Sequence, residues 1–236
     1  MGNQPKKVVI LGTAWPFRGG LSAYNERLAN ELESQGMATE IVTFTVQYPS
    51  ILFPGKTQYS EEPSTFEPIR RKLSSINPIS WWRTANYINA QQPDLVITRY
   101  WIPFMGPCLG TVIRLLNKKI KVICLLDNVI PHEKRIGDSL FTSYFVKPIQ
   151  KYVAMSQSVM DDLYSFKKTA SCALNPHPVF DNFGEKLDQA AAKSELNLDA
   201  NNDYVLFFGF IRKYKGLDLA IRAFAEWKER LPNKKL

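Results

Sequence analysis

The sequence is poor in cysteine and histidine and has no long hydrophobic run. Its three cysteines (Cys108, Cys124 and Cys172) are an odd number without Cys-x-x-Cys spacing. This excludes a disulfide framework and a cysteine zinc site and is typical of a reducing compartment. No window approaches the ~18 apolar residues of a transmembrane helix, and the apolar run at residues 8–11 is too short for a signal peptide. We therefore expect a cytoplasmic protein.

What is present is the composition of a folded globular protein. Hydrophobic residues make up 45% and charged residues 22% of the 236 positions, which excludes a disordered chain. At roughly 150 residues per domain, this length predicts one complete domain and part of another.

The charge balance is basic, with 30 Lys and Arg against 22 Asp and Glu and a net charge of +8. The cations come in short clusters such as Arg70-Arg71-Lys72, and such a surface favours phosphates, anionic lipid headgroups or nucleic acid. No zinc-finger, basic-zipper or RNA-recognition motif accompanies them, so we expect no nucleic-acid partner. Peripheral contact with the anionic inner face of a membrane is compatible with this surface.

Short apolar runs alternate with amphipathic segments, which predicts an α/β fold: a Rossmann-like, doubly wound parallel sheet with helices on both faces. Residues 47–68, rich in Pro, Ser and Tyr, predict a long functional loop or hairpin. Ser158 and Asp161 resemble a capping box at the start of a helix. We expect strands at residues 8–11, 40–44, 94–99, 121–126 and 152–154. We also expect helices at residues 21–32 and 78–91, and a further helix that ends at residue 117.

The pattern restarts towards the C-terminal end. Residues 181–203 are polar and charged and predict a linker, whereas residues 204–208 predict a strand and residues 217–231 an amphipathic helix. One strand and one helix cannot bury a core. We therefore expect a domain at residues 1–180, a linker at 181–203, and the first strand–helix unit of a truncated second Rossmann-like domain at 204–236.

Ligands of open α/β sheets bind beyond the carboxyl ends of the strands, so the loops at these ends are the candidate sites. After the first strand, Gly19 and Gly20 open a helix whose N-terminal amides could receive a phosphate; the alternative is a tight turn into that helix. After a later strand, Tyr100 and Trp101 could stack on a sugar ring or a base, or could simply pack the loop.

The loop from Asp127 to Glu133 follows a buried strand and contains His132, one of two histidines in the chain. Carboxylates and an imidazole in one strand-end loop favour acid–base chemistry, although a lone histidine also serves as a hydrogen-bonding structural residue. His132-Glu133 begins like a zinc-protease helix, but residue 136 is Ile where the second histidine is needed. We therefore expect no metal site.

The most specific motif spans residues 207–218, where a strand end and a glycine are followed by Arg212 and Lys215 just before a helix. Arginine offers two parallel donors, lysine a point charge and the helix N-terminus its dipole. This combination predicts a clamp for a diphosphate.

Four motifs in the same order are similar to those of the family-4 glycosyltransferases of GT-B fold. They are Gly-Gly-Leu-x-x-Tyr at 19–24, Arg-Tyr-Trp-Ile-Pro-Phe at 99–104, Asn-Val-Ile-Pro-His-Glu at 128–133 and Phe-Gly-x-Ile-Arg-x-Tyr-Lys-Gly at 208–216. The resemblance spans the whole chain and implies two Rossmann-like domains facing each other across a cleft, the first holding mainly the acceptor and the second the nucleotide-sugar. It also implies transfer with retention of anomeric configuration, without an essential metal or other cofactor.

The resemblance further implies roles for individual residues. It places donor-phosphate binding on Gly19, Gly20, Arg212 and Lys215, because cations and amides there would neutralise the leaving diphosphate. It places catalysis on Asp127, His132, Arg212 and Lys215, and acceptor binding on Arg18, Arg99, Trp101 and Asn128.

This chain departs from the family pattern in three places. Many members have histidine at the position of Asp127, and the usual Gly-Arg pair is Gly209-Phe210 here, with the arginine displaced to Arg212. The paired glutamates that contact the donor sugar would lie beyond residue 236.

We therefore expect a retaining, hexosyltransferase-like glycosyltransferase that moves a sugar from a nucleotide-sugar donor to a glycan or lipid-linked acceptor in polysaccharide biosynthesis. This chain would be a fragment of it, inactive by itself. The alternative is a non-catalytic module that binds glycan or phosphate through the acceptor domain alone. A nicotinamide-dependent oxidoreductase is disfavoured, because GxGxxG is missing and the second strand ends in Phe44-Thr45 rather than in an acid.

Overall fold

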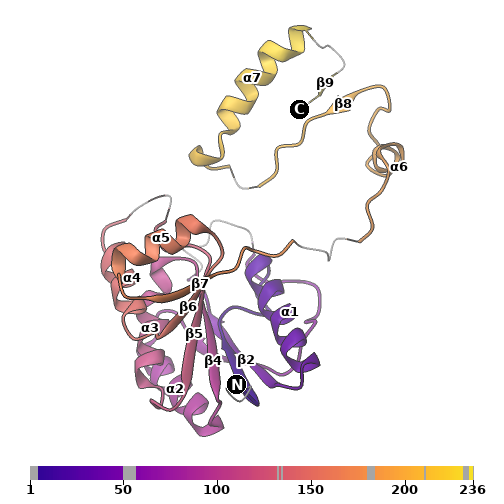
Figure 1. Cartoon of the computed structure of the whole chain (residues 1–236). Coiled ribbons are helices and arrows are strands. Elements are labelled where there is room, and N and C mark those ends of the chain that lie inside the picture. The colour runs from indigo at the N-terminus through magenta and orange to yellow at the C-terminus, as the bar shows by residue number, and fades with distance from the viewer. Residues whose placement is uncertain are drawn as a thin grey trace. The chain divides into compact units, whose positions relative to one another are not determined.

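The computed structural model describes residues 5–49, 57–131, 133, 135–179, 184–209, 211–230 and 234–235 (Figure 1). The chain divides into two compact units, Met1–His177 and Pro178–Leu236. The first unit contains a large sheet with its helices, and the described part of the second contains two α-helices, a short 3-10 helix and a small strand pair.

The first unit is built on one seven-stranded sheet in the order β3-β2-β1-β4-β5-β6-β7. Every neighbouring pair is parallel, which confirms the predicted parallel sheet. The sequence pattern does not predict β3 or β7, which lie at the two edges. The strands are β1 (Lys7–Leu11), β2 (Ala38–Val46), β3 (Ile69–Ser74), β4 (Leu95–Tyr100), β5 (Lys121–Leu126), β6 (Lys151–Ala154) and β7 (Ser171–Leu174).

Helices cover both faces of this sheet, as a doubly wound fold requires (Figure 1). Val8 and Ile10 of β1 join a core under one helix, whereas Val9 and Leu11 join a larger core on the opposite face. The reason is that successive side chains of a strand point to opposite faces. The single helix is α1 (Gly20–Ser34), and the larger core lies under α2 (Pro78–Gln91), α3 (Gly106–Leu115), α4 (Asp138–Val146) and α5 (Gln157–Phe166), with the short η2 (Pro103–Met105) before α3.

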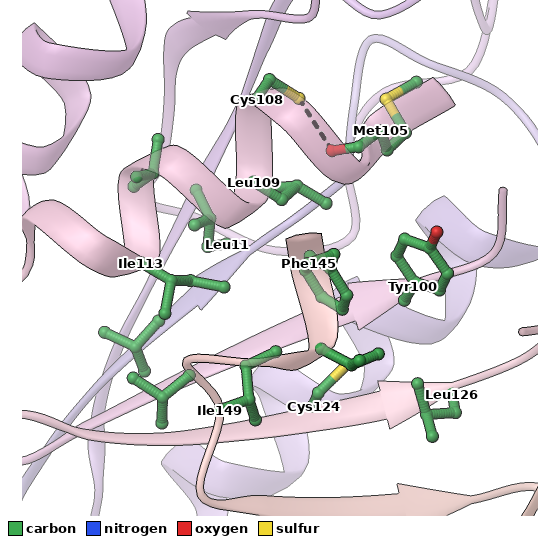
Figure 2. Close-up of a cluster of buried hydrophobic side chains, with 14 of the residues drawn as sticks. Leu11, Tyr100, Met105, Cys108, Leu109, Ile113, Cys124, Leu126, Phe145 and Ile149 are labelled. Carbon is green, nitrogen blue, oxygen red and sulfur yellow. Dashed lines mark hydrogen bonds between the residues drawn. The ribbon is translucent and has the colours of Figure 1, made fainter. Parts of the chain in front are cut away.

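The larger core contains two cysteines, which pack beside Leu109 and Phe145 (Figure 2). All three cysteines of the chain are free, as predicted. Burial raises the pKa of the Cys108 thiol to about 12 and that of Cys124 well above its ordinary value. Both thiols therefore stay protonated and behave as small apolar side chains.

Capping side chains fix where two of the helices begin. The Asn77 side chain accepts a hydrogen bond from the Ile79 amide at 3.0 Å, and a proline follows in the first turn of α2. The predicted cap Ser158 is wrong, because α5 is capped two residues earlier by Ser156, which accepts from the Val159 amide at 3.3 Å. Ser156 has the extended backbone that an N-cap needs, whereas Ser158 already lies within the helix.

The second unit contains α6 (Gln189–Glu195), β8 (Asp203–Tyr204), η3 (Lys213–Lys215), α7 (Leu217–Arg230) and β9 (Lys234–Lys235). The predicted strand at residues 204–208 is wrong beyond Tyr204, because only β8 is paired, with β9. Leu206 and Phe208 are 83% and 88% exposed, and an apolar run without a neighbouring strand leaves its backbone groups unpaired within the unit. α7 begins at Leu217, as predicted.

Candidate functional site at the switch point of the sheet

The order of strands creates a switch point between β1 and β4. From β1 the chain proceeds to β2 and β3 on one side, and it then crosses to β4 and continues to β7 on the other. Ligands of open parallel sheets bind at such points, outside the carboxyl ends of the strands. The predicted strand-end loops after β1, β4 and β5 meet here, so this edge is the candidate site.

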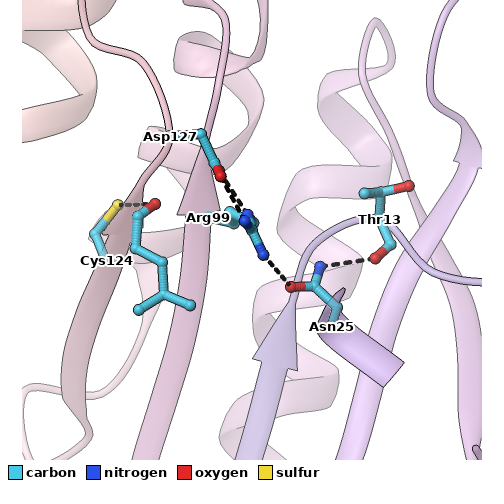
Figure 3. Close-up of polar contacts among 6 residues, drawn as sticks. Thr13, Asn25, Arg99, Cys124 and Asp127 are labelled. Atoms are coloured by element: carbon cyan, nitrogen blue, oxygen red, sulfur yellow. Dashed lines mark hydrogen bonds and ion pairs between the residues drawn. The ribbon is translucent and has the colours of Figure 1, made fainter. Parts of the chain in front are cut away.

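A buried ion pair joins the ends of β4 and β5 (Figure 3). Arg99 Nε donates to Asp127 Oδ2 at 2.5 Å, and its Nη2 donates to Oδ1. The Arg99 side chain is 1% exposed and that of Asp127 is 17% exposed. Such a two-pronged pairing fixes the carboxylate in orientation as well as in charge.

Asn25 connects this pair to the loop after β1 (Figure 3). Its Oδ1 accepts from Arg99 Nη1 at 3.5 Å, and its Nδ2 donates to the Thr13 carbonyl at 2.7 Å. A Cβ at Gly12 would lie 3.0 Å from Asn25 Nδ2, so a glycine at this position leaves room for the contact. The network therefore spans the switch point itself.

Two aromatic rings extend the cluster. The Arg99 guanidinium lies 3.9 Å from the centre of the Tyr24 ring, and the His177 ring packs against Tyr24 at 5.3 Å between centroids. Burial raises the pKa of Tyr24 above its ordinary value, against the opposing charge of Arg99, so the phenol stays neutral. His177, three residues beyond β7, is thereby brought to the same edge as Asp127.

The two predicted glycines form the entry to α1. Gly19 has φ 115°, a left-handed conformation that favours glycine, and α1 begins at Gly20. No side chain caps this helix, and its first turn contains no acidic residue. The positive end of a 15-residue helix therefore lies at the carboxyl edge of the sheet without a negative side chain in its own first turn.

A buried carboxylate holds the loops around this helix in place. Glu26 is 6% exposed. Its Oε1 accepts from the Trp15 amide at 2.8 Å and the Ser22 hydroxyl at 3.2 Å. Its Oε2 accepts from the Ser64 hydroxyl at 3.0 Å and from the Thr65 amide and hydroxyl at 3.0 and 3.1 Å. Glu26 thus ties the predicted long loop to the glycine-containing loop.

The remaining acceptor candidates differ in their surroundings. Trp101 is half-buried, with its ring edge-on to Phe44 and its indole N–H donating to the Tyr48 hydroxyl at 2.7 Å. Asn128 is half-buried beside Asp127, and Arg18 is exposed. The predicted catalytic residue His132 lies outside the described residues.

Arg212 and Lys215 belong to the second unit. Arg212 precedes η3 and accepts through its carbonyl from the Lys215 amide at 2.9 Å. Gly216, with φ 69°, then turns the chain into α7. The two predicted phosphate-binding cations are therefore exposed on one short turn at the N-terminus of a 14-residue helix.

Asn25 and Glu26 are among the members of the site that sequence reasoning missed. For Asn25 a signal was available: it lies four residues after Leu21 and three before Leu28, and so falls on the apolar face of its helix. A polar residue on such a face needs a buried partner. Glu26 gave no comparable signal, because its partners come from loops far along the chain.

Two further observations concern the described part of the chain. Every helix in it is too short or too polar to span a bilayer. None of its His, Cys, Asp and Glu side chains gather in threes at a spacing suited to a metal ion.

A parallel, doubly wound sheet with polar residues at its switch point defines a Rossmann-like domain. Residues 18–172, more than half of the chain, match Glycosyltransferase Family 4, and the chain belongs to that family. This confirms the resemblance drawn from the four motifs.

Individual relatives agree with this family and fold. The crystal structure of Anabaena Alr3699/HepE in complex with UDP and glucose is similar with a TM-score of 0.66 and 13% identity, over 94% of this chain and 58% of that protein. A D-inositol 3-phosphate glycosyltransferase of Frankia alni is 25% identical over an alignment of 240 residues. The alignment covers 92% of this chain and 57% of the relative. The chain thus spans under two thirds of the length of both.

Proposed function

We propose that the protein transfers a sugar from a nucleotide-sugar donor to a glycan or lipid-linked acceptor, with retention of configuration. The observation that carries the proposal is the Arg99–Asp127 pair at the switch point of a Family 4 domain. UDP and glucose in the structurally similar Anabaena protein support a nucleotide-sugar as donor.

In the proposed reaction the oxygen of an acceptor hydroxyl bonds to the anomeric carbon of the donor sugar. The bond from that carbon to the diphosphate breaks, the nucleotide diphosphate leaves with the electron pair, and an oxygen of the leaving diphosphate takes the proton that the hydroxyl gives up. Asp127 would accept a hydrogen bond from the reacting acceptor, and Arg18, Trp101 and Asn128 would line its binding region. The role of His132 remains a prediction.

Charge on the leaving group would be neutralised by protein cations and amides. Arg212 and Lys215 would bind the diphosphate. Phosphate binding by the Gly19 and Gly20 amides at the start of α1 stays a prediction from the family resemblance. Two cations beside a helix N-terminus supply the stabilisation that a metal ion gives elsewhere, so we propose that no essential metal takes part.

A lipid-linked acceptor would place the protein at the inner membrane face, and α2 offers a suitable surface. Ile79 and Trp82, three residues apart, are 61% and 56% exposed, and Arg83 follows them. Apolar side chains next to cations are typical of helices that bind anionic membranes peripherally. The wild type should sediment with vesicles that contain phosphatidylglycerol, whereas an I79S/W82S variant should stay in the supernatant.

The central experiment is a panel of UDP-, GDP- and ADP-sugars with glycan and lipid-linked acceptors, assayed on the full-length protein with the 236-residue chain beside it. Release of nucleotide diphosphate that depends on acceptor supports the proposal, and retained anomeric configuration in the product supports the stereochemistry. Saturable glycan binding without release from any donor would instead favour the non-catalytic module.

A further inference from the structure

We propose that Arg99 is a positioning residue that acts through Asp127, rather than a residue that binds the acceptor. The inference rests on the proposed function, because it names how one group of that site is held. It changes the role expected for Arg99 from the sequence.

Burial is the first reason. With 1% of its side chain exposed, Arg99 presents no surface to a sugar, whereas the 17% of Asp127 that is exposed lies at the carboxyl edge of the sheet. A ligand arriving at this edge therefore meets the carboxylate and not the guanidinium behind it.

The contacts of Arg99 are the second reason, because each of them constrains Asp127. Two guanidinium nitrogens donate to the two carboxylate oxygens, and the third donates to Asn25 Oδ1. The guanidinium carbon lies over the Tyr24 ring. Asn25 is itself fixed to the Thr13 carbonyl at 2.7 Å. The guanidinium can neither rotate nor withdraw without breaking one of these contacts, and so neither can the carboxylate.

The consequence for the reaction follows from hydrogen-bond chemistry. A carboxylate paired in this way accepts hydrogen bonds and donates none. Each oxygen has a second lone pair beyond the one that Arg99 uses, and these can receive an acceptor hydroxyl. Arg99 thus sets the direction from which that hydroxyl is held.

The chain contains a matched control for an arginine stacked on a tyrosine. Arg114 lies 3.7 Å from the centre of the Tyr144 ring and donates to the Gly110 carbonyl at 2.8 Å and to the Tyr144 carbonyl. Within the described part of the chain, the contacts of the Arg114 guanidinium are with backbone carbonyls and a ring, and none is with a carboxylate. Arg114→Lys therefore tests the loss of a stacked guanidinium without affecting Asp127.

The experiment measures kcat and the KM values for donor and acceptor in the full-length protein for R99K, D127N, R99K/D127N and R114K. Each variant is assayed at a temperature below its own unfolding midpoint. Lysine keeps the charge of Arg99 but loses the two-pronged geometry. We expect D127N to lower kcat about 100-fold or more and R99K roughly 10- to 100-fold, with the donor KM within about twofold of wild type. R114K should retain wild-type kcat.

The double variant decides the matter. If Arg99 acts through Asp127, the kcat of R99K/D127N should lie within about threefold of the kcat of D127N, because D127N has already lost the interaction with Arg99. Losses that multiply, or R99K with wild-type kcat, would overturn the inference while leaving the proposed function intact. A wild-type protein without turnover on any donor would overturn the proposed function, and the role of Arg99 with it.

Discussion

The two units of the chain present basic residues in opposite ways. In Met1–His177, Arg99 is enclosed by a carboxylate, an amide and an aromatic ring above a hydrophobic core. In Pro178–Leu236, Arg212 and Lys215 are exposed on a short turn, and none of the side chains described in that unit is buried. The first arrangement stabilises the fold and orients a neighbour, whereas the second keeps its charge available for a ligand.

The difference shows that one residue type can act at two levels. A buried guanidinium needs a partner that offsets its desolvation, so its removal should affect folding. An exposed one contributes little to folding and can contribute much to the stabilisation of a charged leaving group. Substitutions in the two units should therefore change different measured quantities.

The largest expected effect is on the free energy of unfolding. Arg99→Met removes one member of a buried pair and leaves Asp127 without its partner, which should lower the stability of the chain by about 3–5 kcal/mol. Urea denaturation followed by circular dichroism measures it. Arg212→Met is the control and should leave the transition midpoint unchanged; equal losses for both would abolish the contrast between the units.

The next effect concerns turnover alone. Arg212→Ala or Lys215→Ala in the full-length protein should cost about 2.7–4 kcal/mol of transition-state stabilisation, which is roughly 100- to 1000-fold in kcat, by analogy with the loss of one oxyanion donor. Thermal midpoints should not move. Lys213→Ala, on the same turn, serves as the control with a smaller loss, and unchanged turnover in the first two variants would contradict the diphosphate clamp.

A smaller loss of stability is expected at Glu26. Glu26→Gln keeps the shape of the side chain but turns an amide NH2 towards groups that donate, which should cost about 1–3 kcal/mol. Glu31→Gln on the exposed side of the same helix is the matched control. Urea denaturation gives the energy, and faster proteolysis within residues 57–68 should accompany the Glu26 change only.

The smallest effect is a dependence on pH at the opposite edge of the sheet. The Lys7 and Lys6 amides donate to Asp94 at 3.0 and 2.9 Å and hold the pKa of this carboxyl below its ordinary value of 3.8. A lowered pKa contributes stability that is present above the ordinary value and is lost as pH falls through the folded one. Asp94→Asn should therefore flatten the fall of stability as pH decreases below the ordinary value of 3.8; identical acid profiles would refute this.

Much of the central sheet could be predicted from the sequence, because strands buried on both faces appear as continuous apolar runs. The runs that become β1, β4 and β5 were found, and with them the positions of Arg99 and Asp127 at strand ends. The pairing between these two residues could not be predicted, since it depends on β4 and β5 being neighbours and on the direction of a long side chain.

Edge and isolated strands were harder for a physical reason. β3 reads Ile-Arg-Arg-Lys-Leu-Ser and carries the charges typical of an edge rather than an apolar run. Residues 205–208 have the opposite problem, because they are apolar but have no strand to pair with in the described part of their unit. Local composition indicates whether a strand is buried, while hydrogen-bonded neighbours determine whether it forms.

The charged edge strand β3 also bears on how the protein behaves at high concentration. Arg71 donates to the Phe44 and Thr45 carbonyls, Arg70 pairs with Glu40, and Lys72 lies 4.1 Å from the centre of the Tyr87 ring. Three consecutive cations thus occupy the strand at which the sheet would otherwise be extended by another chain. Because like charges meet when two such edges approach, part of the net charge of +8 opposes aggregation.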